Sequence, residues 1–152
     1  MTGPRARLRP LLGLALLAAL ISASTARPAT GPLRLDGASF DPELAVTSRA
    51  RVVGLTNRRE APRDGMLFVF PEPTRGAFSM RDTRVPLTIV FFSYVGRRVA
   101  KLEMVPCRRT PCRLYDPGVS FRFALELRAS DSRPARRLGP ASELRRLVRL
   151  SR

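Results

Sequence analysis

Six polar residues border the most apolar segments of this chain and are the first candidates for chemistry. Arginine forks and carboxylates at such positions could hold a small ligand at the rim of a folded domain, because arginine matches the geometry of carboxylate and phosphate. The alternative is an ion-paired turn in which an aspartate or threonine side chain bonds nearby backbone amides. The candidate ligand-binding residues are Arg58, Asp64, Arg81, Asp82, Thr83 and Arg84.

The chain contains no histidine. Histidine is the commonest general base near neutral pH and a frequent zinc ligand, so Ser-His and Cys-His catalytic arrangements are excluded. Ser79 therefore lacks the residue that would activate it as a nucleophile. We predict no catalytic residue, no metal site and no cofactor.

Paired carboxylates remain a route to catalysis, because glycosidases work with two acidic side chains and need no histidine. The spacing of the acidic residues does not show that any two face one cleft. A histidine-free hydrolase acting on envelope carbohydrate is therefore kept as an alternative. The acidic residues concerned are Asp64, Asp82, Glu103, Asp116 and Glu126.

Cys107 and Cys112 are the only cysteines. In an exported chain, such a close pair is expected to form a disulfide that clamps one loop, with a stabilisation of roughly 2 kcal/mol on the chain-entropy model. A redox-active pair is the rival interpretation, because the flanking arginines would favour a thiolate. Two thiolates without histidine make a poor zinc site.

Residues 1–26 have the three zones of a Sec-type export signal: arginines at positions 5, 7 and 9, the apolar run Leu11–Ala23, and small residues up to Ala26. As a helix, the run would be roughly 20 Å long, too short for a hydrocarbon core of about 30 Å. We predict cleavage after Ala26, with Ser24 as an alternative, and export to the periplasm, the cell surface or the medium. An uncleaved segment would instead tether the protein to the membrane.

The chain is strongly basic, with 28 Lys and Arg against 12 Asp and Glu. Cleavage of the signal would remove three arginines and lower the formal charge from +16 to +13. Such a charge favours anionic partners: a small molecule, a cell-envelope polymer or an anionic lipid surface. Nucleic acid is not expected for an exported chain with few aromatic residues to stack on bases.

The pattern of apolar residues predicts mostly β-structure. Short apolar or alternating runs rich in β-branched and aromatic residues are separated by turn signals such as Asp64-Gly65. Expected strands are 66–70, 78–80, 87–92, 99–105 and 121–127, with 44–47 opening the sheet. In the run 121–127, Phe121, Phe123, Leu125 and Leu127 share one face, while Arg122 and Glu126 are expected to face solvent.

Two segments permit more than one interpretation. Residues 48–55 suit a short helix capped by Thr47 or Ser48, or a strand over 50–55. Residues 142–150 suit a basic amphipathic helix capped by Ser142, or a last strand. The predicted fold is a single compact β-sandwich or partly open barrel with at most one or two short helices. We place a flexible leader at 27–43, the β-rich domain at 44–130 and a basic C-terminal segment at 131–152.

Several motifs resemble, in order, the domain-of-unknown-function family 192. They are Gly54-Leu55 with Arg58, Asp64–Phe70 (DGMLFVF), Phe78-x-Met80-x-x-Thr83, Pro86-Leu87-x-Ile89, Tyr115 and Leu125-Glu126-Leu127. The resemblance covers about residues 44–130 and implies a β-sandwich-like domain, but it brings no established reaction. Three positions depart from the family pattern: Ser79 replaces Trp, Asp82 replaces Asn and Thr88 replaces Asp.

Together, these observations favour an exported, non-enzymatic binding module for a small or anionic envelope ligand. The carbohydrate hydrolase and a structural or partner-binding envelope protein are the alternatives.

Overall fold

The computed structural model describes residues 32–152, so the predicted export signal lies outside the described part. Within this part, no helix is long and apolar enough to cross a membrane. The strands are β1 (Arg34–Leu35), β2 (Ala38–Ser39), β3 (Glu43–Ala45), β4 (Met66–Thr74), β5 (Phe78–Ser79), β6 (Leu87–Phe92), β7 (Arg98–Met104), β8 (Leu114–Tyr115), β9 (Phe121–Arg128) and β10 (Leu138–Gly139), and the helices are α1 (Ser48–Val53) and α2 (Ala141–Leu150).

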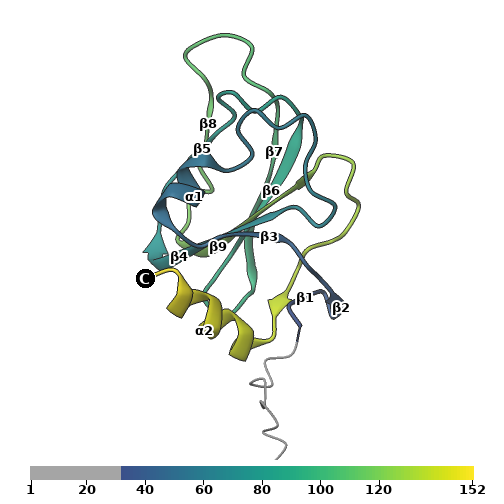
Figure 1. Cartoon of the computed structure of the whole chain (residues 1–152), viewed down its shortest axis with the longest axis vertical. Helices are drawn as coiled ribbons and strands as arrows, with labels where there is room; N and C mark the ends of the chain where they lie inside the picture. The colour runs from purple at the N-terminus through teal and green to yellow at the C-terminus, as the bar shows by residue number, and fades with distance from the viewer. Residues whose placement is uncertain (1–31) are drawn as a thin grey trace, which may run out of the picture.

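A five-stranded sheet of order β3-β4-β9-β6-β7 forms the centre of the molecule (Figure 1). β3 runs parallel to β4, and the remaining neighbours are antiparallel. The apolar runs in β4, β6 and β9 form its three middle strands, because each must be covered on both faces. The predicted mostly β, sandwich-like fold with two short helices is confirmed; the described strands do not close into a barrel.

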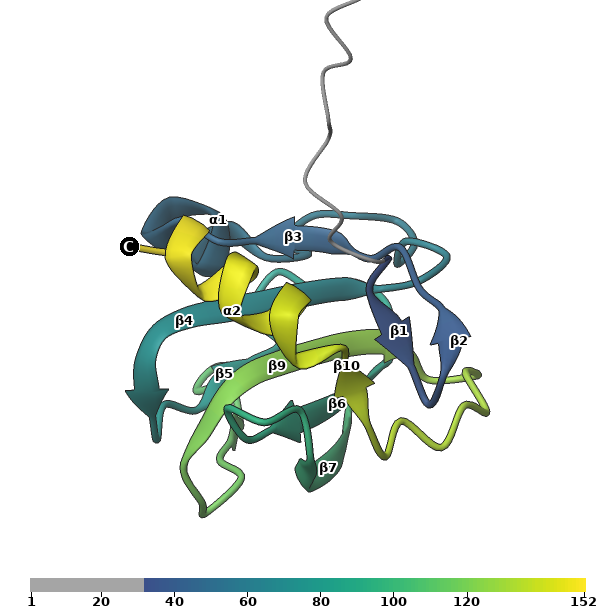
Figure 2. The same cartoon turned by 90° about the horizontal axis from the view of Figure 1, so that it is seen from below.

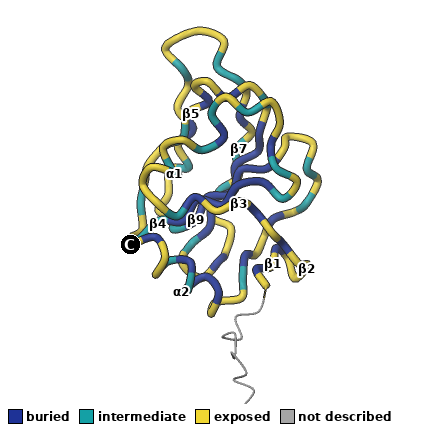
Figure 3. Tube along the Cα trace, viewed as in Figure 1, coloured by how far each residue is buried: buried dark blue, intermediate teal, exposed yellow. Residues whose placement is uncertain are grey.

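Each face of this sheet is covered by its own layer. On one face, α2 lies across β4, next to the small sheet β10-β1-β2 (Figure 2). On the other face lie α1 and the two-stranded β5-β8 sheet (Figure 1). We call the two cores the α2-side core, which includes Leu67, Val69, Phe123 and Leu125, and the α1-side core, which includes Phe68, Ile89, Phe91 and Phe121. Figure 3 shows that the buried residues are concentrated along the central strands.

The segment predicted as a flexible leader is structured over its described part. Asp36 and Gly37 both have positive φ, and they turn the chain between β1 and β2. Leu33, Leu35 and Phe40 are buried in the α2-side core. The prediction of a leader over 27–43 was wrong for this part, because an Asp-Gly hairpin signal was hidden among glycines and prolines.

Both ambiguous segments are helices. In α1, the Thr47 hydroxyl accepts a hydrogen bond from the Ala50 amide at 3.1 Å, which is the predicted N-cap. In α2, Leu144 and Leu147 are buried one helical turn apart. The cap prediction for α2 was wrong, because Pro140 occupies the N-cap and Ser142 lies inside the first turn.

The loop between β7 and β8 stands at the end of the molecule opposite α2 (Figure 1). It contains the Cys107–Cys112 disulfide, with the two Cα atoms 5.5 Å apart, as predicted. A backbone hydrogen bond of 3.4 Å from the Cys107 amide to the Met80 carbonyl joins this loop to the segment after β5.

Candidate functional site

Three of the six predicted ligand-binding residues line one cavity on the α1 side of the sheet. This cavity of about 870 Å³ lies between α1, the second half of β4 and the segment 76–83. β4 loses its regular register with β9 between Val69 and Thr74, and the strand curves away there (Figure 2). Arg81, Asp82 and Thr83 contribute to the wall, whereas Arg58, Asp64 and Arg84 do not.

Four phenylalanine rings form one part of the cavity wall. Phe68 and Phe78 meet edge to face with 5.2 Å between ring centroids, and Phe70 meets Phe121 in the same way at 5.4 Å. Phe78 also lies 6.3 Å from Phe121. The four rings thus hold one another in place, which gives the cavity an apolar wall that is already formed without a ligand.

Glu126 lies in the wall of the same cavity and is only 5% exposed. It belongs to β9, the middle strand of the sheet, and its register partners are Met66 on β4 and Ile89 on β6. No hydrogen bond to its carboxyl group is found from any residue of the described part. Desolvation by this burial raises the pKa of Glu126 to about 8.

The alternating pattern of residues 121–127 predicted a solvent-facing Glu126, and that prediction was wrong. β9 is flanked by strands on both sides and covered by a layer on each face, so both of its faces are buried. Arg122, assigned to the same side, is half-buried and donates to the Pro71 carbonyl. The alternation of apolar and polar residues does not show that both faces of β9 are buried, because the same alternation occurs in strands with one solvent-exposed face.

Two arginines line the cavity in different ways. The Arg51 guanidinium donates to the carbonyl oxygens of Val46 at 2.6 Å and Val69 at 2.9 Å, and it lies 5.4 Å from the centre of the Phe70 ring. Arg51 is therefore a structural residue of the wall. The Arg81 side chain is exposed and, among residues 32–152, is bonded to no other group. It is available to a ligand.

Asp82 and Thr83 complete this side of the cavity. Asp82 has a φ of 55°, and its carbonyl oxygen accepts a hydrogen bond from the Asn57 amide at 2.8 Å. This contact fixes the segment after β5 against the turn that follows α1. Thr83 is buried, and its backbone amide donates to the Met80 carbonyl at 3.2 Å.

The other predicted site residues form ion pairs or hydrogen bonds outside the cavity. Arg58 forms a two-pronged pair with Glu43, with distances of 2.7 and 2.6 Å, and this pair lowers the pKa of the Glu43 carboxyl. Arg84 reaches the Asn57 side chain at 3.5 Å. Arg58 is thus held by an ion pair and Arg84 by a hydrogen bond, and neither side chain lines the cavity.

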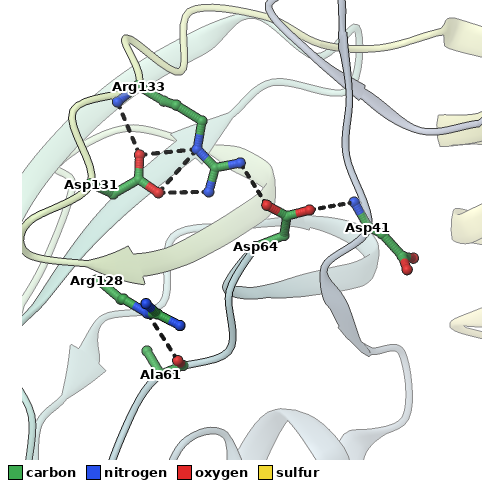
Figure 4. Close-up of polar contacts among 6 residues, drawn as sticks. All are labelled: Asp41, Ala61, Asp64, Arg128, Asp131 and Arg133. Atoms are coloured by element: carbon green, nitrogen blue, oxygen red, sulfur yellow. Dashed lines mark hydrogen bonds and ion pairs between the residues drawn. The ribbon is translucent and has the colours of Figure 1, made fainter.

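Asp64 belongs to a separate group of charges, which we call the clasp and define as Asp64, Asp131 and Arg133 (Figure 4). The Arg133 guanidinium binds Asp131 at 2.6 Å and Asp64 at 2.9 Å. The second Asp64 oxygen accepts from the Asp41 amide at 3.1 Å. The Arg133 hydrogen bonds lower the pKa of Asp131. The clasp fastens the chain after β9 to the turn before β4.

The described part of the chain contains no group of three or more potential metal-ligating side chains. Of the acidic residues considered for catalysis, Asp82 and Glu126 line the cavity, and Asp64, Glu103 and Asp116 do not.

The model of the family DUF192, described as "Uncharacterized ACR", matches residues 32–136, and the chain belongs to this family. None of the curated proteins compared with the chain matches it. A crystal structure from Sinorhizobium meliloti 1021, described as a "putative transcription regulator", is 30% identical with a TM-score of 0.60, covering 70% of this chain and 90% of that one. A protein of unknown function from Novosphingobium aromaticivorans DSM 12444 is 25% identical with a TM-score of 0.60, covering 84% and 100%.

The three departures from the family pattern fall on different sides of the sheet. Ser79 and Asp82 line the cavity. Thr88 is buried on β6 and, by strand alternation, shares the opposite face with Val90 of the α2-side core. The cavity of this chain therefore differs from the family pattern at two wall positions.

Proposed function

We propose that this protein is an exported, non-enzymatic binding module that holds a small amphipathic ligand in the cavity beside α1. The apolar part of the ligand packs against the phenylalanine rings, and its polar or anionic end reaches Arg81. The observation that carries this proposal is a preformed cavity whose wall combines phenylalanine rings with the unpartnered side chains of Arg81 and Glu126.

Size and chemistry support this proposal. A volume of about 870 Å³ falls within the range of small-molecule sites. The charged groups of the clasp and of the Arg58–Glu43 pair satisfy one another, whereas Arg81 does not take part in such a pair. An unpaired arginine beside an apolar wall suits a ligand with an anionic end.

Export is supported by the predicted signal at residues 1–26 and by the Cys107–Cys112 disulfide, since disulfides persist in oxidising compartments. Cell fractionation and intact-mass measurement of the natural protein test it. We expect the protein in the envelope or medium, beginning at Arg27. A cytoplasmic protein with its N-terminal segment intact would contradict export.

Ligand occupancy can be tested by purifying the full chain natively from envelope extract and identifying co-purifying small molecules by mass spectrometry. Ser79→Trp places a large ring in the cavity wall, so we expect it to deplete the bound compound. Ser130→Trp, at an exposed position outside the cavity, is the matched control and should retain it. Equal recovery from both variants, or no compound from any form, would count against the proposal.

The proposed contact between Arg81 and the anionic end of the ligand is tested by a second pair of substitutions. Arg81→Ala should weaken the binding of the recovered compound about tenfold if a charged hydrogen bond is lost. Arg84→Ala removes an arginine three positions away that does not line the cavity, and it should leave binding unchanged. Equal effects of the two substitutions would indicate a general charge effect instead of a contact.

The hydrolase alternative retains one supporting observation, because Asp82 and Glu126 line the same cavity. Release of sugar from envelope polysaccharide that is abolished by both Asp82→Asn and Glu126→Gln would favour it over a binding module. Nucleic-acid binding is not proposed, since Tyr94 is the one exposed aromatic side chain in the described part of the chain.

A further inference from the structure

Glu126 is a buried polar side chain that the protein itself leaves without a partner. Its register partners across the sheet, Met66 and Ile89, carry no hydrogen-bond donor, and Glu126 lines the ligand cavity. A buried carboxyl group without a partner is costly, and proteins seldom keep one without a use. Its position in the wall makes it available to whatever occupies the cavity.

Charged side chains from α1, from β4 and from the segment after β5 share the cavity wall with Glu126. Arg51 on α1, Glu72 on β4, and Arg81 and Asp82 after β5 line the cavity. Arg51 is held by backbone carbonyls, as described above. β6 carries no charged residue over its length.

On β9 itself, Arg122 donates to the Pro71 carbonyl, and Arg128 donates to the Ala61 carbonyl at 3.1 Å. Tyr115 from β8 lies in the same core, where its hydroxyl accepts from the Val105 amide at 3.0 Å. None of these groups forms a hydrogen bond with the Glu126 carboxyl group. The protonation of Glu126 is therefore governed by desolvation, which favours the neutral acid at neutral pH.

A neutral carboxylic acid is a hydrogen-bond donor through its O–H group. We propose that Glu126 donates this hydrogen bond to an uncharged oxygen, such as an amide or ketone carbonyl, on the apolar end of the ligand. This inference rests on the proposed binding function and narrows its ligand class to compounds with a neutral carbonyl group attached to an apolar body.

Charged groups fit this end of the cavity less well. A ligand carboxylate buried beside Glu126 would lose its hydration next to another carboxyl group, and of the two arginines that line the cavity only the exposed Arg81 is free to pair with it. An organic cation could interact with the phenylalanine faces, but it would have to ionise Glu126 inside an apolar core. An uncharged acceptor neither brings a second charge into the cavity nor requires Glu126 to ionise.

Three probes that share a naphthalene ring but differ in the charge of the head group distinguish these cases: 2-naphthamide, 2-naphthoate and (2-naphthylmethyl)trimethylammonium. Their dissociation constants for the full chain would be measured by calorimetry or NMR between pH 6 and pH 9.5. We expect 2-naphthamide to bind best at pH 6.5. Its affinity should fall by up to tenfold per pH unit once Glu126 ionises.

Two variants isolate the donor. Glu126→Gln keeps an N–H donor, so it should bind 2-naphthamide within about threefold of the natural chain and lose the pH dependence. Glu126→Leu removes the donor and should bind about fivefold to tenfold more weakly at pH 6.5. Both variants remove the cost of burying an unpartnered carboxyl group, so we expect both to fold.

Each outcome decides one of the two proposals. If 2-naphthamide binds equally to the natural chain and to Glu126→Leu, or if the cation binds best and improves with pH, the donor role is overturned while the binding module stands. If 2-naphthoate binds best and Glu126→Leu has no effect, the neutral-acceptor class is wrong. If no probe binds at millimolar concentration at any pH, both proposals fall.

Discussion

Two carboxyl groups in different regions of this molecule have pKa values that are shifted in opposite directions. In the clasp, Asp131 lies 2.6 Å from the Arg133 guanidinium, and its pKa is lowered by those hydrogen bonds. In the cavity, Glu126 has apolar neighbours on both sides, and its pKa is raised to about 8. Both groups are held by β9 or the turn after it, so they share one rigid support.

The difference separates residues that hold the fold from residues free to act on a ligand. The clasp joins segments distant in the sequence, and its donors and acceptors are matched within the protein (Figure 4). In the cavity wall, by contrast, the side chains of Glu126 and Arg81 form no hydrogen bond or ion pair with other residues of the described part. Four predictions test this contrast, from the largest expected effect to the smallest.

Gly65 links the two regions, because it follows Asp64 and abuts Glu126. Its φ is 75°, and an added Cβ atom would lie 2.1 Å from the Glu126 carbonyl oxygen. Gly65→Ala should therefore destabilise the protein by more than about 3 kcal/mol, because neither the Gly65 backbone nor the Glu126 carbonyl group can move aside without disrupting the strands β4 and β9. Urea unfolding measures this.

Gly118→Ala is the matched control, since Gly118 has a similar φ of 70° but nothing within 4 Å of the added atom. It should cost only about 1 kcal/mol from the positive φ. Equal losses for the two variants would show that the close approach to β9 does not matter.

Glu126→Gln should stabilise the protein increasingly as the pH rises. Since the folded pKa of about 8 exceeds the unfolded value of 4.5, the folded state holds more protons between these values. Stability of the natural chain is thus greatest below about pH 4.5 and is lost as the pH rises towards 8, by about 3–5 kcal/mol.

The variant cannot ionise at this position, so its advantage over the natural chain should grow across that window. Urea unfolding at pH 5 and pH 8.5 measures it, with Glu103→Gln, at an exposed position, as the control. An advantage that is the same at both pH values would contradict a neutral buried Glu126.

Asp131→Asn tests the opposite sign in the clasp. The pKa of Asp131 is lowered in the folded state, so its stabilisation is present above its unfolded value of 3.8 and is lost as the pH falls below it. The substitution should cost about 1–2 kcal/mol at pH 7 and progressively less below pH 4. A cost that does not shrink in acid would show that packing, and not the ion pair, is lost.

Arg58→Ala should have the smallest effect. The pair with Glu43 has good geometry, but the two side chains are 39% and 45% exposed. Exposed ion pairs contribute about 0.2–1 kcal/mol, and salt screens them. Thermal unfolding with and without 0.5 M NaCl measures the loss. A loss above that of Asp131→Asn would reverse the ranking of the two pairs.

Much of the fold could be predicted from local chemistry. The strands at 66–70, 87–92 and 121–127 are too apolar and too rich in β-branched and aromatic residues for a surface segment. Thr47 marks the start of α1 through its capping hydroxyl. The hairpin formed by β1 and β2 was missed, because its two strands are short and only packing against α2 and β10 makes them stable.

The cavity was predicted only in part, for a physical reason. Its wall is assembled from segments between Ser48 and Glu126, so no local pattern encodes it. Arg81, Asp82 and Thr83 were identified because they border an apolar segment. Glu126 was placed on the wrong side, because sequence alternation does not show whether a second layer covers a face. The motif Leu125-Glu126-Leu127, an acid between buried leucines, was the available signal.

The most direct test is the titration of the Glu126 side-chain carbonyl carbon, followed by 13C NMR on the full chain and assigned with Glu126→Gln. A group desolvated by the apolar wall should titrate near pH 8. Saturating 2-naphthamide should move the midpoint higher still, since it binds the protonated form. A midpoint near 4.5, or one that falls when 2-naphthamide binds, would contradict a neutral donor in the ligand cavity.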